Sequence, residues 1–416
     1  MSCHASTEMF STPRARWPLL LSFTSFTSFT LSACIAPNVV HAPAPRVDTA
    51  SGSVKPGPSV VFPLLGESCS SKPEAGSTLD VSRVRVAGRS ESEAAGGLRF
   101  AWSGTALSFR FRGSQFQIEL DDSGRNWFGV TLDGVDLNGK LSTYGGHHCY
   151  RLADNLAAGE HRLTITRLTE AMLGETALVT ANAGESGEIL GQEAAPARRL
   201  EVIGDSITAA YGVEGENRYC HFSAETENQA LSYAALVGRR FHADVATIAW
   251  SGKGVFSNRG STSDTIPMPV LWERTLPLRD DSRWDFSAWA PDAAVIELGT
   301  NDFAPENPDK GPFAEAYRAF LFRVRAVYPK AALVCALSPL LSDQWPPGAH
   351  VRSLARAGIQ AAIEAAKARG DSRVFYVEHR EATDAEGWGC DWHPSRVTQA
   401  RMAGELGASL AKILGW

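Results

Sequence analysis

From residue 199 to the end of the sequence, short apolar runs alternate with amphipathic helical segments. A strand followed by a helix and a second strand of the same sheet forms a right-handed βαβ unit, which makes the sheet parallel. Uninterrupted apolar runs are typical of strands buried on both faces. We therefore predict an α/β domain in which helices cover both faces of a parallel sheet. The predicted strands are 200–203, 245–250, 293–298, 331–337 and 374–377, and the predicted helices are 230–241, 313–328, 353–368 and 395–414.

Residues 79–185 follow a different pattern, in which short runs alternate between apolar and polar residues. Turn residues separate these runs, among them Asp133-Gly134, which is a strong hairpin signal. Strands at this spacing predict a β-sandwich domain in front of the α/β domain. Residues 186–198 contain Gly, Pro and small residues, and they are the predicted connection between the two domains.

Two tryptophans and a pair of histidines in the predicted sandwich could suggest binding. Trp102 is expected in the core, which is the commoner place for an aromatic residue of a strand. Trp127 lies beside a turn, so a core position and a sugar-stacking position both remain open. His147-His148 is expected to lie in a loop and not at a metal site, because adjacent strand side chains face opposite ways.

The first 34 residues have the features of an export signal. Arg14 and Arg16 precede a short apolar core, which ends at Leu31-Ser32-Ala33-Cys34. These four residues resemble a bacterial lipoprotein processing box, in which Cys34 would become the lipid-modified first residue. The alternative is an ordinary cleaved signal peptide in which Cys34 is incidental. Residues 35–78, rich in Pro, Ala, Ser and Gly, are a predicted flexible stalk.

We therefore expect an exported protein, anchored to a membrane by lipid and facing the periplasm or the cell exterior, or otherwise secreted. The composition is that of a globular protein, with 44% hydrophobic and 21% charged residues. A net charge of −6 and the lack of a basic block argue against a nucleic-acid partner. The seven cysteines form no CxxC or Cys/His cluster, so we do not expect a zinc site. We expect no cofactor either. Some cysteines could pair, but the sequence leaves the connectivity open.

Polar or glycine-rich stretches follow four of the predicted parallel strands. Because the carboxyl ends of parallel strands meet at one edge of a sheet, these stretches can converge on one pocket. Each stretch alone is a weak signal, and their appearance together and in order supports a functional site. They are Gly204-Asp205-Ser206, Ser251-Gly252-Lys253-Gly254, Gly299-Thr300-Asn301-Asp302 and Gly389-Cys390-Asp391-Trp392-His393-Pro394.

These residue types fit nucleophilic catalysis by a serine. Ser206 would be the nucleophile and His393 the base that takes its proton. Attack on an ester carbonyl builds negative charge on oxygen, which needs fixed donors. The backbone N–H of Ser206 and the side-chain amide of Asn301 are two candidate donors. The third is the N–H of Gly254 or Gly252, and counting from the strand end favours Gly254.

With these motifs the chain resembles the SGNH (GDSL-type) hydrolases, and carbohydrate esterase family 2 in particular, over residues 80 to 416. The blocks that carry the resemblance are Gly204-Asp205-Ser206-Ile207-Thr208, Thr226-Glu227-Asn228, Ser251-Gly252-Lys253-Gly254, Leu298-Gly299-Thr300-Asn301-Asp302 and Gly389-Cys390-Asp391-Trp392-His393-Pro394. It implies a jelly-roll-like β-sandwich joined to a flavodoxin-like hydrolase domain at 199–416. It also implies removal of acetyl groups from polysaccharides such as xylan and mannan, without a metal.

The chain departs from the common SGNH pattern at the acid. Many of these enzymes place it three residues before the histidine, where this sequence has Cys390, and the acid here is Asp391, two residues before. Asp391 could orient His393, or the site could be a Ser206–His393 dyad assisted by a backbone carbonyl.

The predicted function is that of a serine esterase acting on acetylated polysaccharide or oligosaccharide, such as xylan or glucomannan. Trp392 and Trp345 could form a sugar platform near the acyl site, or they could pack inside the protein. A lipid esterase or thioesterase of the same class is one alternative. A non-catalytic glycan-binding lipoprotein is the other.

Overall fold

The computed structural model describes residues 69, 79–94, 96–260, 265–307 and 311–416. The predicted signal at 1–34 with Cys34, and nearly all of the predicted stalk, lie outside these residues and stay predictions. Among the helices of the described residues, none combines the length and the apolar character needed to span a bilayer.

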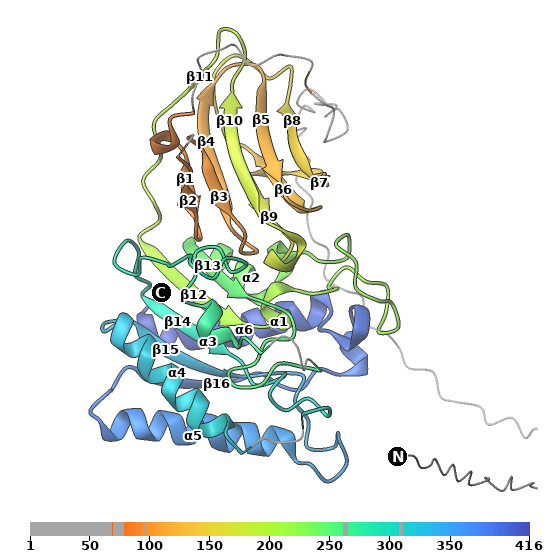
Figure 1. Cartoon of the computed structure of the whole chain (residues 1–416), viewed down its shortest axis with the longest axis vertical. Coiled ribbons are helices and arrows are strands. Elements are labelled where there is room, and N and C mark those ends of the chain that lie inside the picture. Colours follow the sequence, from red (N-terminus) through yellow and green to blue (C-terminus); the bar gives the residue numbers. More distant parts are fainter. Residues whose placement is uncertain (1–68, 70–78, 95, 261–264, 308–310) are drawn as a thin grey trace, which may run out of the picture. The chain divides into compact units, whose positions relative to one another are not determined.

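The N-terminal half of the described chain consists of two antiparallel sheets (Figure 1). One sheet has the order β1-β4-β9-β6-β7, with β11 paired to β4, and the other has the order β2-β3-β10-β5-β8. In β4 and β5 every second residue is buried, as expected where one face of each sheet packs on the other. The strands are β1 (Arg85–Ala87), β2 (Glu91–Ser92), β3 (Leu98–Phe100), β4 (Ala106–Arg112), β5 (Phe116–Asp122), β6 (Trp127–Leu132), β7 (Val135–Ser142), β8 (Gly146–Ala153), β9 (Glu160–Arg167), β10 (Thr176–Asn182) and β11 (Glu188–Ile189).

The C-terminal half is built on a five-stranded parallel sheet of order β13-β12-β14-β15-β16. In this order the chain first adds a strand on one side of β12 and then continues on the other side, so the topological switch point lies at β12. Open α/β sheets bind ligands at such a point. The prediction of an α/β domain joined to a β-sandwich is therefore confirmed. The elements are β12 (Arg198–Gly204), β13 (Ala243–Ala249), β14 (Ala293–Glu297), β15 (Ala332–Leu337) and β16 (Val374–Glu378), with α1 (Ser206–Ala209), α2 (Tyr233–Phe241), α3 (Met268–Leu271), α4 (Phe313–Val327), α5 (Val351–Ala368) and α6 (Arg396–Leu414).

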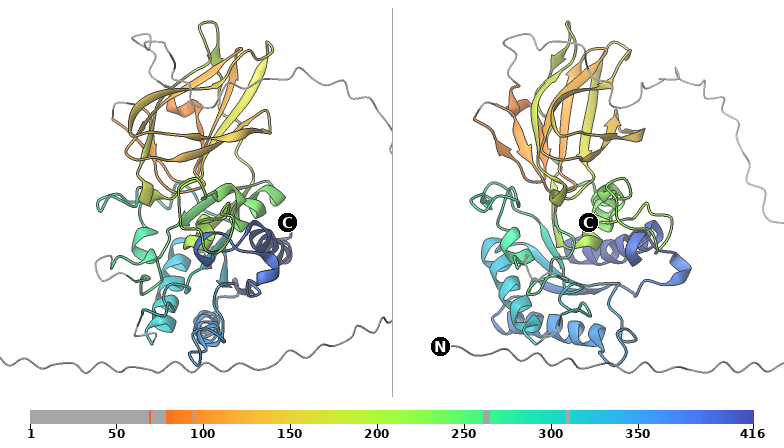
Figure 2. Two further views of the ribbon diagram at one scale, coloured as in Figure 1. Left: turned by 90° about the vertical axis from the view of Figure 1, so that its right-hand side faces the viewer. Right: turned by 45° about the vertical axis from the view of Figure 1, so that its right-hand side comes forward.

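Successive residues of β12 show how the parallel sheet is buried on both faces. Val202 packs in the cluster that contains α2 and α6, and its neighbour Ile203 packs in the cluster that contains α4 and α5. Both side chains are fully buried. Figures 1 and 2 show the same two helix layers around the sheet. The strand that leads to Ser206 is therefore packed by helices on both faces.

The segment between β1 and β2 inserts a charged side chain into the hydrolase domain. Arg89 is 1% exposed, and its guanidinium donates to Glu201 of β12 at 3.1 Å. The Trp272 indole also donates to this carboxylate, at 2.6 Å. Removing one partner of a buried ion pair costs about 3–5 kcal/mol, because the other charge is left uncompensated. The β-sandwich is thus tied to the strand that carries the nucleophile candidate.

The tryptophans and histidines singled out in the sandwich take different positions. Trp102 is fully buried, as expected, and packs in the hydrolase core cluster. Trp127 is half-buried, with Arg125 and Lys140 over its ring at 5.6 and 5.3 Å. His147-His148 lies in β8 and not in a loop, with both side chains exposed. The described residues contain no cluster of three or more His, Cys, Asp or Glu that could hold a metal.

Candidate active site

Ser206 lies at a sharp turn between β12 and the one-turn helix α1. Asp205 caps this helix, because its Oδ1 accepts the backbone N–H of Ile207 at 3.0 Å. A Cβ atom at Gly204 would come within 2.0 Å of the Thr208 hydroxyl oxygen, so only glycine fits at the end of the strand. The turn holds the Ser206 hydroxyl at the carboxyl edge of the sheet, where its side chain reaches the cavity described below.

His393 meets Ser206 across 187 residues of sequence. The distance from His393 Nε2 to Ser206 Oγ is 2.9 Å, and that from His393 Nδ1 to the carbonyl oxygen of Cys390 is 3.1 Å. A carbonyl can only accept a hydrogen bond, so the proton of the neutral imidazole is on Nδ1. Nε2 therefore has a free lone pair for the serine proton, as a general base requires.

Asp391 has other partners than His393. Its Oδ2 accepts from the Tyr211 hydroxyl at 2.8 Å and from the Phe222 backbone N–H at 3.0 Å, and its Oδ1 faces His221 Nδ1 at 2.9 Å. The prediction that this carboxylate orients the imidazole is corrected by this geometry. The cause is local, since Asp391 has a left-handed backbone (φ 51°) that turns its side chain toward the 211–222 segment. The alternative expectation, a dyad assisted by a carbonyl, agrees with the structure.

The loop that carries His393 is fastened to the 211–222 segment. A disulfide joins Cys390 to Cys220, so the structure gives the pairing that the sequence left open. The backbone N–H of Cys390 donates to the carbonyl of Gly212 at 3.0 Å. The Tyr211 ring stacks on the imidazole, with 4.1 Å between ring centroids. Tyr211 is not part of any of the sequence motifs, so the sequence did not identify it as a residue of the site.

The candidate oxyanion donors are not equally available. Asn301 Nδ2 donates to Asp205 Oδ2 at 3.2 Å and to the carbonyl of Lys253 at 2.9 Å, so its amide is fixed beside the nucleophile turn. The N–H of Gly254 donates to Asn258 Oδ1 at 3.2 Å. The N–H of Gly252 has no hydrogen-bond partner among the described residues. Gly252 also has a left-handed backbone (φ 79°) and open space beside it.

These contacts favour Gly252 over Gly254 as the oxyanion glycine, against the preference from strand counting. Gly254 has a packing role instead. A Cβ there would come within 2.1 Å of the Ser257 carbonyl oxygen and 2.6 Å of an Asp302 carboxylate oxygen. Asp302 holds this loop by accepting the backbone N–H groups of Val255, Phe256 and Ser257 at 2.7–2.9 Å.

A cavity of about 730 Å³ opens at Ser206 and His393. Asn301, Asp391 and the two candidate platform tryptophans also line it. Trp345 is 68% exposed and Trp392 is 50% exposed, so neither ring is part of the core. The guanidinium of Arg218 lies 4.4 Å from the Trp392 ring centroid. The structure thus brings both tryptophans to the cavity that holds the predicted catalytic pair.

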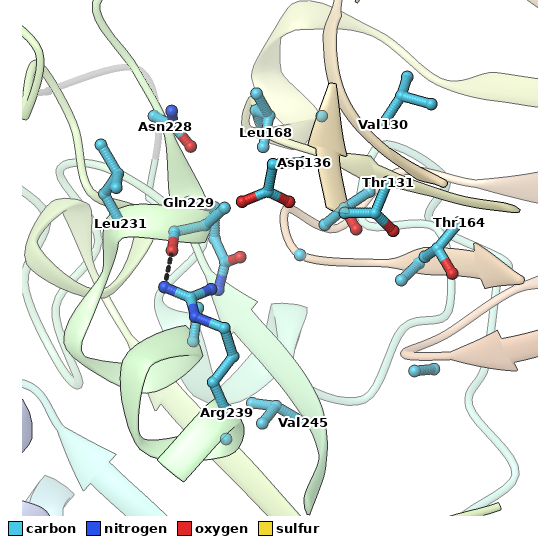
Figure 3. Close-up of a pocket in the computed structure, with 18 of the residues that line it drawn as sticks. Val130, Thr131, Asp136, Thr164, Leu168, Asn228, Gln229, Leu231, Arg239 and Val245 are labelled. Atoms are coloured by element: carbon cyan, nitrogen blue, oxygen red, sulfur yellow. Dashed lines mark hydrogen bonds between the residues drawn. The ribbon is translucent and has the colours of Figure 1, made fainter. Parts of the chain in front are cut away.

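A second cavity, of about 500 Å³, contains none of the candidate residues (Figure 3). Thr131 and Thr164 line it from the β-sandwich, and Gln229 and Arg239 line it from the hydrolase domain. It has no aromatic residue among those that line it. A sugar ring would therefore find no stacking surface there, and the cavity at Ser206 is the candidate site.

Known proteins share this combination of domains. The family model described as "Carbohydrate esterase 2 N-terminal" matches residues 86–192, and that described as "GDSL-like Lipase/Acylhydrolase family" matches residues 202–401. The chain is 36% identical to the cellulase/esterase CelE of Acetivibrio thermocellus over 332 residues, which are 79% of this chain and 39% of that protein. It is 26% identical to an acetylxylan esterase / glucomannan deacetylase of Cellvibrio japonicus, over 80% of this chain and 89% of that protein.

A solved structure agrees with this assignment. The structure of a family two carbohydrate esterase from Clostridium thermocellum, in complex with cellohexaose, is 34% identical in sequence and superposes with a TM-score of 0.75. The match covers 80% of this chain and 99% of that chain. Fold and site thus define a GDSL-like esterase domain joined to a β-sandwich. The chain belongs to carbohydrate esterase family 2. It spans about two fifths of the length of CelE.

The geometry predicts that Asp391 contributes little to orienting the base. Asp391→Asn keeps one acceptor for the 211–222 segment, so kcat on 4-nitrophenyl acetate is expected to stay within about tenfold of wild type. A triad carboxylate is worth about 10⁴-fold in kcat. His393→Ala, the positive control, should lose nearly all activity. A loss of about 10⁴-fold in Asp391→Asn, with native circular dichroism, would show that a carboxylate does orient the base.

The pH dependence of the reaction provides a second test. Burial lowers the pKa of His393 to about 4, and burial raises the pKa of Asp205 to about 7. A histidine base must be neutral, so kcat/KM for 4-nitrophenyl acetate is expected to hold from pH 8 to 5.5 and to fall as the pH approaches 4. Asp205→Asn is the control for the other titration. An acid limb near pH 6.5 in both proteins would contradict the low pKa of His393, and a limb near pH 7 that this variant abolishes would belong to Asp205.

Proposed function

We propose that this protein is a serine esterase that removes O-acetyl groups from polysaccharides. The observation that carries the proposal is the 2.9 Å contact between His393 Nε2 and Ser206 Oγ, with the imidazole proton held on Nδ1 by a carbonyl. This is the arrangement that a nucleophilic serine and its base require. It supports catalysis over a purely glycan-binding role.

The reaction follows from the protonation states of the pair. Ser206 Oγ attacks the acetyl carbonyl carbon while its proton passes to His393 Nε2. The N–H groups of Ser206 and Gly252 hold the oxygen of the tetrahedral intermediate, and the Asn301 amide fixes Asp205 and the Lys253 carbonyl beside them. The intermediate collapses as the sugar oxygen leaves with the proton from Nε2, and an acetyl–serine ester remains. Water, deprotonated by the same nitrogen, hydrolyses this ester and releases acetate.

The surroundings of the pair support a carbohydrate substrate. Trp345 and Trp392 expose aromatic faces at the same cavity, and such faces stack on sugar rings. One relative is named for acetylxylan and glucomannan, and another was solved with cellohexaose. We therefore propose acetylated xylan, glucomannan or related oligosaccharides as substrates. A lipid esterase or thioesterase would not need an aromatic platform.

Acetate release tests this proposal. The full chain is expected to release acetate from acetylated xylan and glucomannan. Ser206→Ala should lower kcat by at least about 10³-fold, because the acetyl–enzyme forms on the Ser206 hydroxyl. Ser287→Ala, in an exposed loop, is the matched control. Equal release by wild type and Ser206→Ala would rule out the mechanism.

The same assay separates a sugar platform from a generic ester pocket. Trp345→Ala should raise KM on the acetylated polysaccharide and leave 4-nitrophenyl acetate hydrolysis unchanged, because the small ester needs no sugar contact. An equal KM change on both substrates, or preferential hydrolysis of long-chain esters, would favour the lipid esterase alternative.

We also propose that the protein is exported and held at a membrane by lipid on Cys34, in the motif Leu31-Ser32-Ala33-Cys34. Detergent-phase partitioning of the expressed full chain measures this. The wild-type protein should enter the detergent phase and Cys34→Ala should stay in the aqueous phase. If both proteins stay in the aqueous phase, the alternative of an ordinary cleaved signal peptide is favoured over the lipid anchor.

A further inference from the structure

A carboxyl group of the β-sandwich reaches the loop that carries the oxyanion glycine. Glu170 follows β9 and is fully buried. Its side chain accepts hydrogen bonds from both the backbone N–H and the hydroxyl of Ser251. Ser251 immediately precedes Gly252, whose N–H is the unpartnered donor described above. Both hydrogen-bond donors of Ser251 are therefore fixed by a residue of the other domain.

The contacts continue from Ser251 to the nucleophile turn. Lys253, two residues on, accepts the Asn301 amide at 2.9 Å, and the same amide donates to Asp205. Hydrogen bonds from Ser251 to Glu170 and from Asn301 to the Lys253 carbonyl thus fix the residues on both sides of Gly252. If the Glu170 carboxylate were lost, the half-buried Ser251 would lose the acceptor of both its N–H and its hydroxyl, and the peptide before Gly252 would be free to rotate.

Glu170 is itself held by a second buried carboxyl group. Its backbone N–H donates to Glu227 Oε2 at 3.1 Å, and Glu227 is fully buried. Burial and the adjacent Glu170 carboxylate raise the pKa of Glu227 well above its usual range. The buried Arg167 guanidinium donates to the Glu170 carbonyl oxygen at 3.0 Å. Such an arrangement is costly to bury, and these contacts hold Glu170 in place beside Ser251.

We propose that Glu170 is a positioning residue of the oxyanion hole, through which the β-sandwich fixes Ser251 and thereby the N–H of Gly252. The inference rests on the proposed esterase function. It makes the β-sandwich part of the catalytic apparatus, because one of its side chains sets a donor that acts in the transition state.

Kinetics on 4-nitrophenyl acetate test the inference without glycan binding. Glu170→Ala is expected to lower kcat by about 10²-fold with KM within about twofold, because a misplaced donor weakens binding of the transition state and not of the ester. Glu170→Gln should recover kcat to within about tenfold of wild type, since its amide oxygen accepts the Ser251 N–H and the Ser251 hydroxyl can turn to accept. Ser251→Ala, combined with Glu170→Ala, should show effects on kcat that are less than additive.

Glu175→Ala is the matched control. Glu175 is also a buried carboxylate of the β-sandwich that binds the hydrolase domain, through Arg279 at 2.6 Å, but it has no contact with the Ser251 loop. This variant should lower the unfolding temperature and keep kcat within about threefold of wild type. If kcat falls equally in Glu170→Ala and Glu175→Ala, the inference is overturned, because domain association alone would explain both.

The inference is also overturned if folded Glu170→Ala keeps kcat within about threefold of wild type. Should Glu170→Ala fail to fold, Glu170→Asp and Ser251→Ala test the inference in its place. Each of these variants removes one contact between Glu170 and Ser251, so each should lower kcat by at least about tenfold. Unchanged kcat in both would overturn the inference. A wild-type protein without esterase activity would instead refute the proposed function, so the two failures are distinguishable.

Discussion

The hydrogen bond from His393 Nδ1 to the carbonyl of Cys390 is the interaction on which the site depends, because it holds the proton of the neutral imidazole on Nδ1. A carbonyl carries no full charge, so it stabilises an imidazolium less than a carboxylate would. Geometry compensates in part, since the Cys220–Cys390 disulfide and the stacked Tyr211 ring hold the loop and the imidazole in place. The role left for Asp391 is to fasten this assembly to the 211–222 segment.

The two domains cooperate more closely than their different strand patterns suggest. Arg89 and Trp102 come from the β-sandwich region, yet both are buried in the hydrolase half, one against Glu201 and one in the core cluster. Glu170 adds a contact to the Ser251 loop. Each of these three side chains contacts residues far away in the sequence, and no local sequence pattern connects the partners. The β-sandwich is therefore an integral part of the hydrolase structure, and its deletion would expose an uncompensated Glu201 in the strand that leads to Ser206.

Periodicity predicted the fold well, because buried parallel strands and amphipathic helices leave local traces in the sequence. The strand-end motifs also predicted which loops converge, and the structure brings Ser206, His393 and Asn301 together. The orientation of single side chains was beyond this reasoning. Asp391 turns away from His393 in a loop where Asp391 and Trp392 both have a left-handed backbone. The choice between Gly252 and Gly254 depends on where Asn258 and Asp302 point. Nothing local in the sequence encodes these contacts.

The buried carboxyl groups around the nucleophile raise an electrostatic question, because full charges there would oppose the negative oxygen of the transition state. Burial raises the pKa of Asp205 to about 7, and burial raises the pKa of Asp302 and, much further, that of Glu297. A raised pKa lowers the fraction of a carboxyl group that is charged at a given pH, and a carboxyl group in either form accepts backbone N–H bonds. Asp302 accepts three such bonds and so orders the loop beyond Gly254. Their raised pKa values therefore let these acids shape the oxyanion hole with less repulsion of the charge that it must bind.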